Sequence, residues 1–259
     1  MSEADKESAR GSPGKGRHRN DIYGRLDRRS EDEEGVVPPI AAATVVLLRD
    51  AEAGPEVLML RKNSKITFGG MWVFPGGKID AEDFGTSEDP EVAARNAAAR
   101  EADEEASILL RPDEFVWFAH WTPPPGLQKR FATWFFAAIV DDEHDVDIDQ
   151  GEIDDHAWIR PGDALARHSA GEIDMVPPTW VTLYHLSLYT PCARILDHFR
   201  ENEAKTYSTR VGKTGAGDRV AMWHGDAGYE SWDANAQGHR HRLVMARGGF
   251  TFENSIESY

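Results

Sequence analysis

A strand, a glycine turn and a long helix are predicted by residues 74–108, which read FPGGKIDAEDFGTSEDPEVAARNAAAREADEEASI. The strand-like segment Met71–Phe74 stops at a proline and two glycines, which permit a tight turn and a close approach of the backbone. Further on, Asp89 stands directly before Pro90, a pairing that favours the start of a helix. The residues from there to Ser107 are rich in Ala, Glu and Arg, all strong helix formers.

Three glutamates of this predicted helix, Glu101, Glu104 and Glu105, fall within an arc of about 100° on one face. Carboxylates this close repel one another unless a cation lies among them, and the hard cations Mg²⁺ and Mn²⁺ prefer oxygen ligands. Arg100 precedes Glu104 by four residues and can hold one carboxylate through its planar guanidinium. Taken alone, the pattern is more typical of a solvated amphipathic helix than of a metal site. The preceding glycine turn favours the metal, because its carbonyls can complete the coordination.

The combination of Gly77 with Arg100-Glu101-x-x-Glu104-Glu105 resembles the Nudix box, in which a glycine, a spaced glutamate and such a helix follow one another. Nudix enzymes are metal-dependent hydrolases of a nucleoside diphosphate linked to another moiety. The resemblance implies that Arg100 orients the glutamates and that Glu104 and Glu105 take part in catalysis. It also implies a set of ligands for Mg²⁺ or Mn²⁺, consisting of one backbone carbonyl and three carboxylates: Gly76, Glu101, Glu104 and Glu105.

This sequence departs from the usual box in three places. Arg100 lies 23 positions after Gly77, about nine more than in the usual box, and the segment 81–88 is expected to form a surface excursion. Six residues after Gly77, where the spaced glutamate would stand, the sequence has Asp83, and Ser107 replaces the terminal glycine. None of the three changes removes a carboxylate from the helix.

A carboxylate outside the helix could also take part in the expected hydrolysis. Metal ions on the glutamates would bridge the substrate phosphates and lower the pKa of a bound water. The acidic region 145–155 could supply a catalytic base or a further metal ligand, and Glu152 is the first choice in it.

A second match concerns the substrate. Trp121-Thr122-Pro123-Pro124 and the segment RFATWFF at 130–136 resemble the Nudix branch that contains peroxisomal coenzyme A diphosphatases. Coenzyme A or its esters therefore head the expected substrates, with NADH, ADP-ribose and nucleotide sugars as further possibilities. Arg61 and Arg130 could grip a 3′-phosphate, and Phe131 could stack on a base. The competing interpretation is that the two arginines form ordinary exposed ion pairs and that Phe131 belongs to the core.

The order of elements predicts a mixed α/β (α+β) chain, with a Nudix-like α/β/α sandwich around a mixed sheet. Residues 1–36 have few apolar side chains and are expected to be a disordered tail. Residues 37–190 would form the Nudix hydrolase domain. Residues 191–259, which contain helical and strand-like segments, would form a C-terminal extension packed on that domain.

The composition limits which partners the protein can bind and which cellular compartment suits it. Of 259 residues, 29 are Lys or Arg and 45 are Asp or Glu, a formal net charge of −16, so stable nucleic-acid binding is not expected. A single cysteine, Cys192, excludes an internal disulfide and fits a reducing compartment. No apolar run reaches the length of a membrane span, and the N-terminal residues do not resemble a secretion signal. We expect a cytoplasmic protein that binds a small nucleoside diphosphate derivative, possibly as a homodimer.

One other class of function stays open at this point. A Nudix fold could bind a nucleotide or a protein partner as a regulatory module without turnover, and the altered spacing and Ser107 favour that alternative. The retained Arg100 and the three glutamates favour an enzyme.

Overall fold

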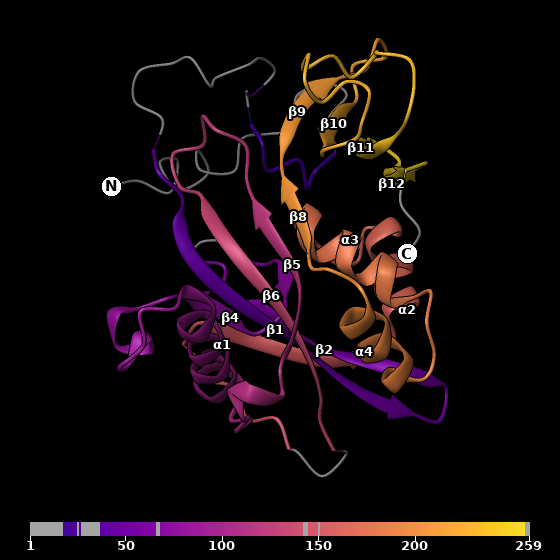
Figure 1. The fold of residues 1–259 in the computed structure, drawn as a ribbon. Coiled ribbons are helices and arrows are strands. Elements are labelled where there is room, and N and C mark those ends of the chain that lie inside the picture. The colour runs from indigo at the N-terminus through magenta and orange to yellow at the C-terminus, as the bar shows by residue number, and fades with distance from the viewer. Residues whose placement is uncertain are drawn as a thin grey trace, which may run out of the picture. The chain divides into compact units, whose positions relative to one another are not determined.

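The computed structural model describes residues 18–24, 26, 37–65, 68–141, 145–149 and 151–256, and its ribbon is shown in Figure 1. Contacts divide the chain into two compact units. The larger comprises residues 30–209, and the smaller combines residues 1–29 with residues 210–258.

The larger unit is built on a mixed sheet of eight strands. Six of them follow the order β3-β2-β1-β6-β5-β8, while β4 pairs with β1 and β7 pairs with β2. The pairs β1–β6 and β5–β8 are parallel, whereas β1–β2 and β5–β6 are antiparallel, which confirms the expected mixed sheet. The strands are β1 (Ile40–Ala51), β2 (Gly54–Lys62), β3 (Trp72–Val73), β4 (Gly76–Lys78), β5 (Val116–Thr122), β6 (Phe131–Ile139), β7 (Ile153–Ile159) and β8 (Lys205–Ser208).

Helix α1 (Pro90–Ala106) covers one face of this sheet. Asp89 caps its start by accepting a hydrogen bond from the Glu91 N–H at 2.9 Å, and Ser107 ends it in the left-handed conformation with φ 55°. Helices often end on a residue in this left-handed conformation, and glycine adopts it more easily than serine does. Ser107 therefore has the conformation expected of the glycine that ends the usual box.

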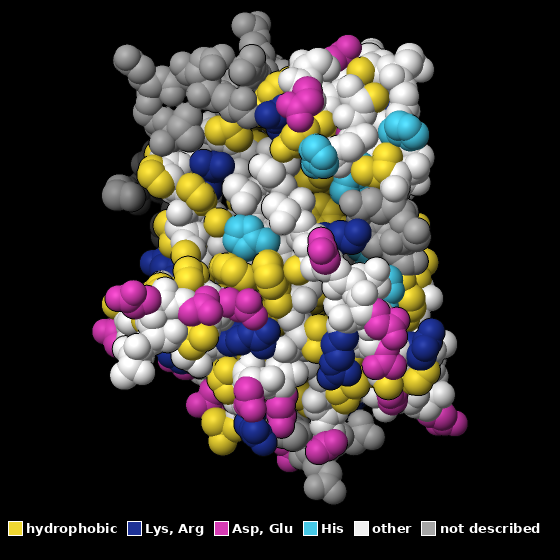
Figure 2. Space-filling model, viewed as in Figure 1, with side chains coloured by type: hydrophobic (Ala, Val, Ile, Leu, Met, Phe, Trp, Pro, Cys, Tyr) yellow, Lys and Arg dark blue, Asp and Glu magenta, His cyan; other side chains and the backbone are white. Residues whose placement is uncertain are grey.

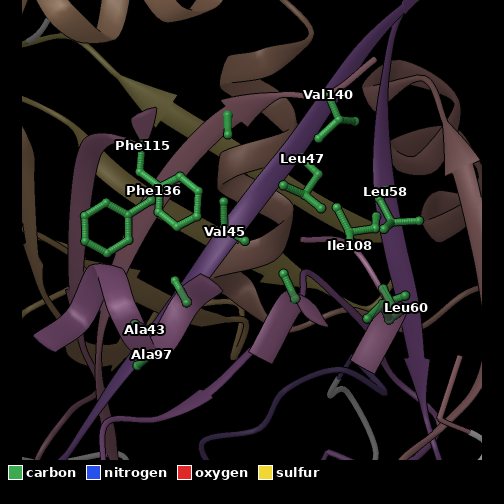
Figure 3. Close-up of a cluster of buried hydrophobic side chains, with 14 of the residues drawn as sticks. Ala43, Val45, Leu47, Leu58, Leu60, Ala97, Ile108, Phe115, Phe136 and Val140 are labelled. Carbon is green, nitrogen blue, oxygen red and sulfur yellow. The ribbon is translucent and has the colours of Figure 1, made fainter. Parts of the chain in front are cut away.

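A hydrophobic core fills the space between α1 and the sheet (Figure 3). Alternate residues of β1 point into it, as the period of two along a strand requires. The facing side of α1 carries alanines, whose small side chains let the helix approach the strands closely. The main contributors are Ala43, Val45 and Leu47 from β1, Leu58 and Leu60 from β2, Phe136 from β6, and Ala94, Ala97, Ala98 and Ala102 from α1.

Three further helices, α2 (Pro161–Ser169), α3 (Pro177–Leu186) and α4 (Cys192–Glu201), belong to the same unit. The ring of Phe199 from α4 stacks on Phe118, whose own ring contacts Phe135 on the face away from the α1 core. Helices therefore cover both faces of the sheet, which confirms the α/β/α sandwich. Within the described part of the chain, no helix is long and apolar enough to cross a bilayer.

The boundary between the units differs from the one expected from the sequence. Helix α4 and strand β8, both assigned to the extension, lie in the larger unit, because β8 pairs with β5 and α4 packs on β5 and β6.

The segment 81–88 is only partly the expected surface excursion. It begins with the 3-10 helix η3 (Ala81–Phe84), in which Ala81 and Glu82 are exposed but Asp83 is buried. A second short 3-10 helix, η4 (Pro112–Glu114), precedes β5.

The smaller unit contains an antiparallel sheet of four strands in the order β12-β11-β10-β9. Residues 18–24, which the sequence places in a disordered tail, are described in this unit, and the Tyr23 side chain is buried. Asp21 contacts Arg219 at 3.3 Å, and this buried partner explains why part of the expected tail is ordered. Apart from Leu26, the rest of that tail lies outside the described residues. The strands are β9 (Arg210–Lys213), β10 (Arg219–Met222), β11 (His241–Ala246) and β12 (Gly249–Asn254).

Candidate active site

Two glycines of β4 bring its backbone against β1 and α1. Gly76 is paired with Thr44 of β1, and a Cβ atom at Gly76 would lie 2.5 Å from the Ala43 carbonyl oxygen. Because backbone atoms surround this position, no side chain fits at Gly76. A Cβ atom at Gly77 would meet the carboxylate of Glu101, the end of a side chain that would have to move away. The turn therefore lies directly beside Glu101.

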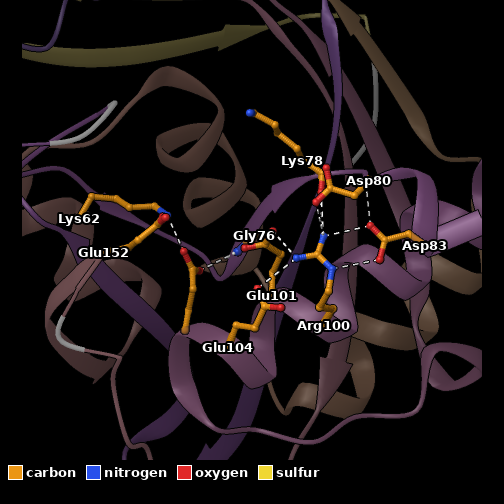
Figure 4. Close-up of polar contacts among 10 residues, drawn as sticks. Lys62, Gly76, Lys78, Asp80, Asp83, Arg100, Glu101, Glu104 and Glu152 are labelled. Atoms are coloured by element: carbon orange, nitrogen blue, oxygen red, sulfur yellow. Dashed lines mark hydrogen bonds and ion pairs between the residues drawn. The ribbon is translucent and has the colours of Figure 1, made fainter.

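Glu101, Glu104 and Glu105 occupy one face of α1 but differ in exposure. The side chain of Glu105 is 4% exposed, while that of Glu104 is 58% exposed, and Glu101 lies between these extremes. One oxygen of Glu105 accepts a hydrogen bond from the Gly76 N–H at 3.0 Å, and the other contacts the ammonium of Lys62 (Figure 4). The acidic face therefore runs from the buried carboxylate of Glu105, next to β2, to the exposed carboxylate of Glu104.

Arg100 joins this acidic face to Asp83 in the segment 81–88 (Figure 4). Its Nε and Nη2 atoms donate to the two carboxylate oxygens of Asp83, both at 3.0 Å, a two-pronged contact. Its Nη1 atom donates to Glu101 at 2.9 Å and to Glu104 at 3.1 Å. Nη2 also donates to the carbonyl oxygen of Lys78 at 3.0 Å. Arg100 thus orients two glutamates while Asp83 and the turn fix its own position.

Sequence reasoning did not identify the role of Asp83, although a signal was present. Asp83 stands six residues after Gly77, the position of the spaced glutamate in the usual box. An aspartate there supplies the same charged group on a shorter side chain, and the buried placement of η3 brings it to Arg100.

Burial and ion pairs shift the pKa values of this site in ways that suit a cation. Burial raises the pKa of Glu105 to about 7, because Lys62 and the Gly76 N–H offset only part of the cost of burying the charge. Burial likewise raises the pKa of Glu101. Burial opposes ionisation of Asp83 too, but the hydrogen bonds from Arg100 outweigh it and lower that pKa. Burial would lower the pKa of Lys62, and the contact with Glu105 raises it instead.

Glu152 lies beside this cluster. Its carboxylate is 3.5 Å from the Lys62 ammonium, and its side chain is 64% exposed. The backbone fixes that position, because the Asn63 N–H donates to the Glu152 carbonyl oxygen at 2.6 Å. Glu152 is therefore near Glu105, with Lys62 between the two carboxylates.

The expected substrate-binding residues contact other groups. Arg61 follows Leu60 on β2 and points to the face away from Lys62, where it donates to Asp154 at 2.6 Å. Arg130 is buried and donates to the carbonyl oxygens of Pro123 at 2.8 Å and Val37 at 3.0 Å, so its guanidinium holds the chain around it.

Phe131, the third expected substrate-binding residue, is half-buried at the start of β6. Its ring lies 6.3 Å from that of Phe68, and the Lys129 ammonium lies 5.2 Å from its centroid. Phe68 has a φ of 60°, a left-handed conformation that is uncommon for an aromatic residue. These contacts form an aromatic cluster separate in sequence from the glutamate helix.

The donor set of α1 and β4 fits a hard divalent cation. Carboxylate oxygens and a backbone carbonyl are the ligands that Mg²⁺ and Mn²⁺ take in proteins. Among the side chains that the structure describes, no three His, Cys, Asp or Glu residues converge closely enough to enclose an ion. Instead, Lys62 and Arg100 lie among the carboxylates and neutralise them. A metal would therefore have to replace one of these contacts.

Comparisons with known proteins identify the family of the chain. Residues 38–178 match the family model described as the NUDIX domain. The putative nudix hydrolase 7 of Caenorhabditis elegans is 25% identical over 183 residues, which are 57% of this chain and 60% of that relative's length. The crystal structure of a NUDIX hydrolase from Alicyclobacillus acidocaldarius superposes with a TM-score of 0.55 at 24% identity, over 62% of this chain and 96% of that one. This structural likeness concerns the fold.

Proposed function

The chain belongs to the Nudix family, and from that membership we propose that it hydrolyses the pyrophosphate bond of a nucleoside diphosphate linked to another moiety. The contact network of Arg100 carries the proposal. One guanidinium bonds Asp83, Glu101 and Glu104 at 2.9–3.1 Å. A helix that only presented a solvated surface would not need one arginine to fix the orientation of two of its carboxylates.

Mg²⁺ or Mn²⁺ would be held by the carboxylates of Glu101, Glu104 and Glu105 and by the carbonyl oxygen of Gly76. When bound, the ions supply positive charge that attracts the substrate phosphates and stabilises the leaving oxygen. The protein's own part is to orient the glutamates. Arg100 donates hydrogen bonds to Glu101 and Glu104, and the Gly76 N–H donates one to Glu105.

Glu152 is our candidate for the catalytic base. Its carboxylate is solvent-exposed and lies one lysine away from Glu105, so it can reach a water near the acidic face. An exposed carboxylate can release a proton to solvent after each turnover, which a buried group such as Glu105 cannot do as readily.

Coenzyme A or its esters are the first substrates to test, followed by NADH, ADP-ribose and nucleotide sugars. The resemblance of the segments at 121–124 and 130–136 to coenzyme A diphosphatases supports this order. The contacts of Arg130 change the expected grip on a 3′-phosphate, because that guanidinium is already used by backbone carbonyls. Arg61, whose side chain is partly exposed beside Asp154, is the more available cation.

A screen of pyrophosphate compounds with and without Mg²⁺ tests the proposal. We expect hydrolysis of at least one such compound, with products released by cleavage between the two phosphorus atoms, and no turnover after chelation. A chain that binds nucleotides without hydrolysing any of them would favour the alternative, a regulatory binding module. Comparison of coenzyme A with 3′-dephospho-coenzyme A then tests the substrate order: equal rates on both would contradict a 3′-phosphate subsite and leave the hydrolase proposal in place.

A further inference from the structure

The Lys62 ammonium lies against the buried carboxylate of Glu105, one of the groups expected to bind the divalent cation. It contacts one carboxylate oxygen, and the other oxygen accepts the Gly76 N–H at 3.0 Å. Each oxygen of this carboxylate therefore already has a partner within the protein. A cation that binds the oxygen contacted by Lys62 has to compete with the ammonium for it.

We propose that Lys62 is a positioning residue that serves as the internal counter-ion of the metal site: it neutralises Glu105 in the metal-free protein and passes to Glu152 when a divalent cation binds. The inference rests on the proposed function, because it presupposes that the acidic helix binds such a cation.

The sheet fixes both partners of Lys62. Alternate residues of β2, Leu58 and Leu60, point into the core beneath α1, and Lys62 continues that row to the end of the strand. At this point the register with β7 shifts, so that Lys62 pairs with Ile153. The shift carries Glu152 next to the lysine, with its carboxylate 3.5 Å from the ammonium (Figure 4).

The different burial of the two carboxylates gives the exchange its direction. Glu105 is 4% exposed, and a buried charge without a counter-ion is costly, so the lysine stays there while no metal is present. A divalent cation at the same oxygen interacts with twice the charge and displaces the ammonium. Glu152 is exposed, so it can accept the ammonium at little desolvation cost, and the flexible four-carbon stem of lysine allows the movement.

The accessibility of Lys62 in the unaltered protein gives the first test. The full chain is treated briefly with an amine-acylating reagent in the absence and presence of Mg²⁺, and modification of each lysine is quantified by mass spectrometry. We expect modification of Lys62 to rise severalfold with Mg²⁺, while the exposed Lys65 is modified equally in both conditions. Unchanged or reduced modification of Lys62 at saturating Mg²⁺ would overturn the proposal.

The affinity for Mn²⁺ gives a second test that does not depend on turnover. Free Mn²⁺ is measured by electron paramagnetic resonance for the wild type, K62M, K62R and K78M. Removing the competing charge should tighten Mn²⁺ binding by about tenfold in K62M, whereas K62R should remain near the wild type. K78M removes the same charge from β4 without a contact to Glu105 and should have a smaller effect. Weaker or unchanged binding in a folded K62M protein would overturn the proposal.

Apart from its proposed part as catalytic base, Glu152 could receive the Lys62 ammonium or bind the metal directly. The substitution E152Q distinguishes these two roles. If Glu152 receives the lysine, E152Q weakens Mn²⁺ binding in the wild type but has little effect in the K62M background. If E152Q weakens binding equally in both backgrounds, Glu152 is a direct ligand and the transfer proposed here is wrong. A wild-type protein that binds no Mn²⁺ at all would instead contradict the metal dependence in the proposed function, so the two failures are distinguishable.

Discussion

Asp83 and Arg100 are joined by two parallel hydrogen bonds, each 3.0 Å long. These bonds connect the segment 81–88 to helix α1, which carries the glutamates. The Asp83 side chain is buried, so this pair is partly shielded from water. Arg100 uses its remaining donors on Glu101 and Glu104. Asp83 therefore acts on the candidate metal site through the arginine.

The first prediction concerns this pair. D83N keeps the shape of the side chain but loses the charge and one acceptor oxygen, so Arg100 is held less firmly and the glutamates lose their orientation. Partners of this kind are typically worth about 10- to 100-fold in metal affinity or activity. We expect a loss of that size in the steady-state rate and in Mn²⁺ affinity. The neighbouring exposed residue provides the control: E82Q should behave as the wild type, and equal losses in both variants would show that the segment acts only through its overall charge.

The second prediction concerns the helix itself. E104Q and E105Q each remove a charged ligand while keeping size and helix propensity, and kcat should fall by orders of magnitude in both. Their stabilities should differ, however. Glu104 is 58% exposed, so E104Q should melt as the wild type does, whereas E105Q leaves Lys62 without its buried partner.

Thermal melting and rate measurements on the same preparations check this prediction. D103N is the matched control, because Asp103 directly precedes Glu104 on α1 and is exposed. Near-normal kcat in both glutamine variants would remove these residues from the candidate site.

Local sequence was sufficient for the elements that build the site. The helix start at Asp89 and Pro90 could be predicted because capping and the proline position are local properties, and α1 begins at Pro90. The continuous apolar run at 40–48 is typical of a buried strand, and it forms most of β1. The three glutamates could be placed on one face because helical spacing alone determines it.

What the sequence could not show depended on contacts between distant segments. Arginine has the same charge whether it binds a substrate or its own backbone, and the burial of Arg130 against Val37, 93 residues away, could not be predicted from spacing. Strand β8 joins the sheet through a parallel pairing with β5, which no local pattern indicates. Lys62 meets Glu105 because β2 ends beside α1, a result of the sheet topology.

The third prediction uses the pH dependence of the smaller unit. Arg242 donates to both oxygens of buried Asp226, one of them at 2.6 Å. Burial alone would raise the pKa of Asp226, but the hydrogen bonds from Arg242 and from the N–H groups of His241 and Gly228 lower it. A lowered pKa in the folded state means that this carboxylate stabilises the fold above the pKa of an unfolded aspartate, about 3.9, and that the stabilisation is lost as the pH falls below it.

Calorimetric melting of the wild type and D226N from pH 7 to pH 2 tests this expectation. At pH 7 the substitution should cost about 3–5 kcal/mol, because Arg242 is left buried without its partner. The difference in Tm should stay constant down to about pH 4 and shrink below it, because the unfolded aspartate then binds a proton before the folded one does. E253Q, which removes an exposed partner of Arg240 in the same unit, is the control and should lower Tm little at any pH. A difference for D226N that stays constant with pH would show that Asp226 does not titrate as described.

The fourth prediction concerns the N-terminal residues that the sequence placed in a tail. Asp21 and Arg219 form a buried ion pair at 3.3 Å, and Arg219 also donates to the Gly24 carbonyl oxygen at 2.9 Å. Removing one member of a buried pair costs about 3–5 kcal/mol, whereas an exposed pair is worth under about 1 kcal/mol. D21N should therefore destabilise the smaller unit far more than E230Q, which breaks the exposed pair of Arg210 with Glu230 in the same unit. Denaturant unfolding gives the two free-energy changes, and hydrogen exchange of residues 18–24 shows whether D21N releases the segment. If D21N and E230Q cost the same and the segment keeps its protection, the ion pair does not hold these residues on the sheet, and their order must come from the burial of Tyr23 instead.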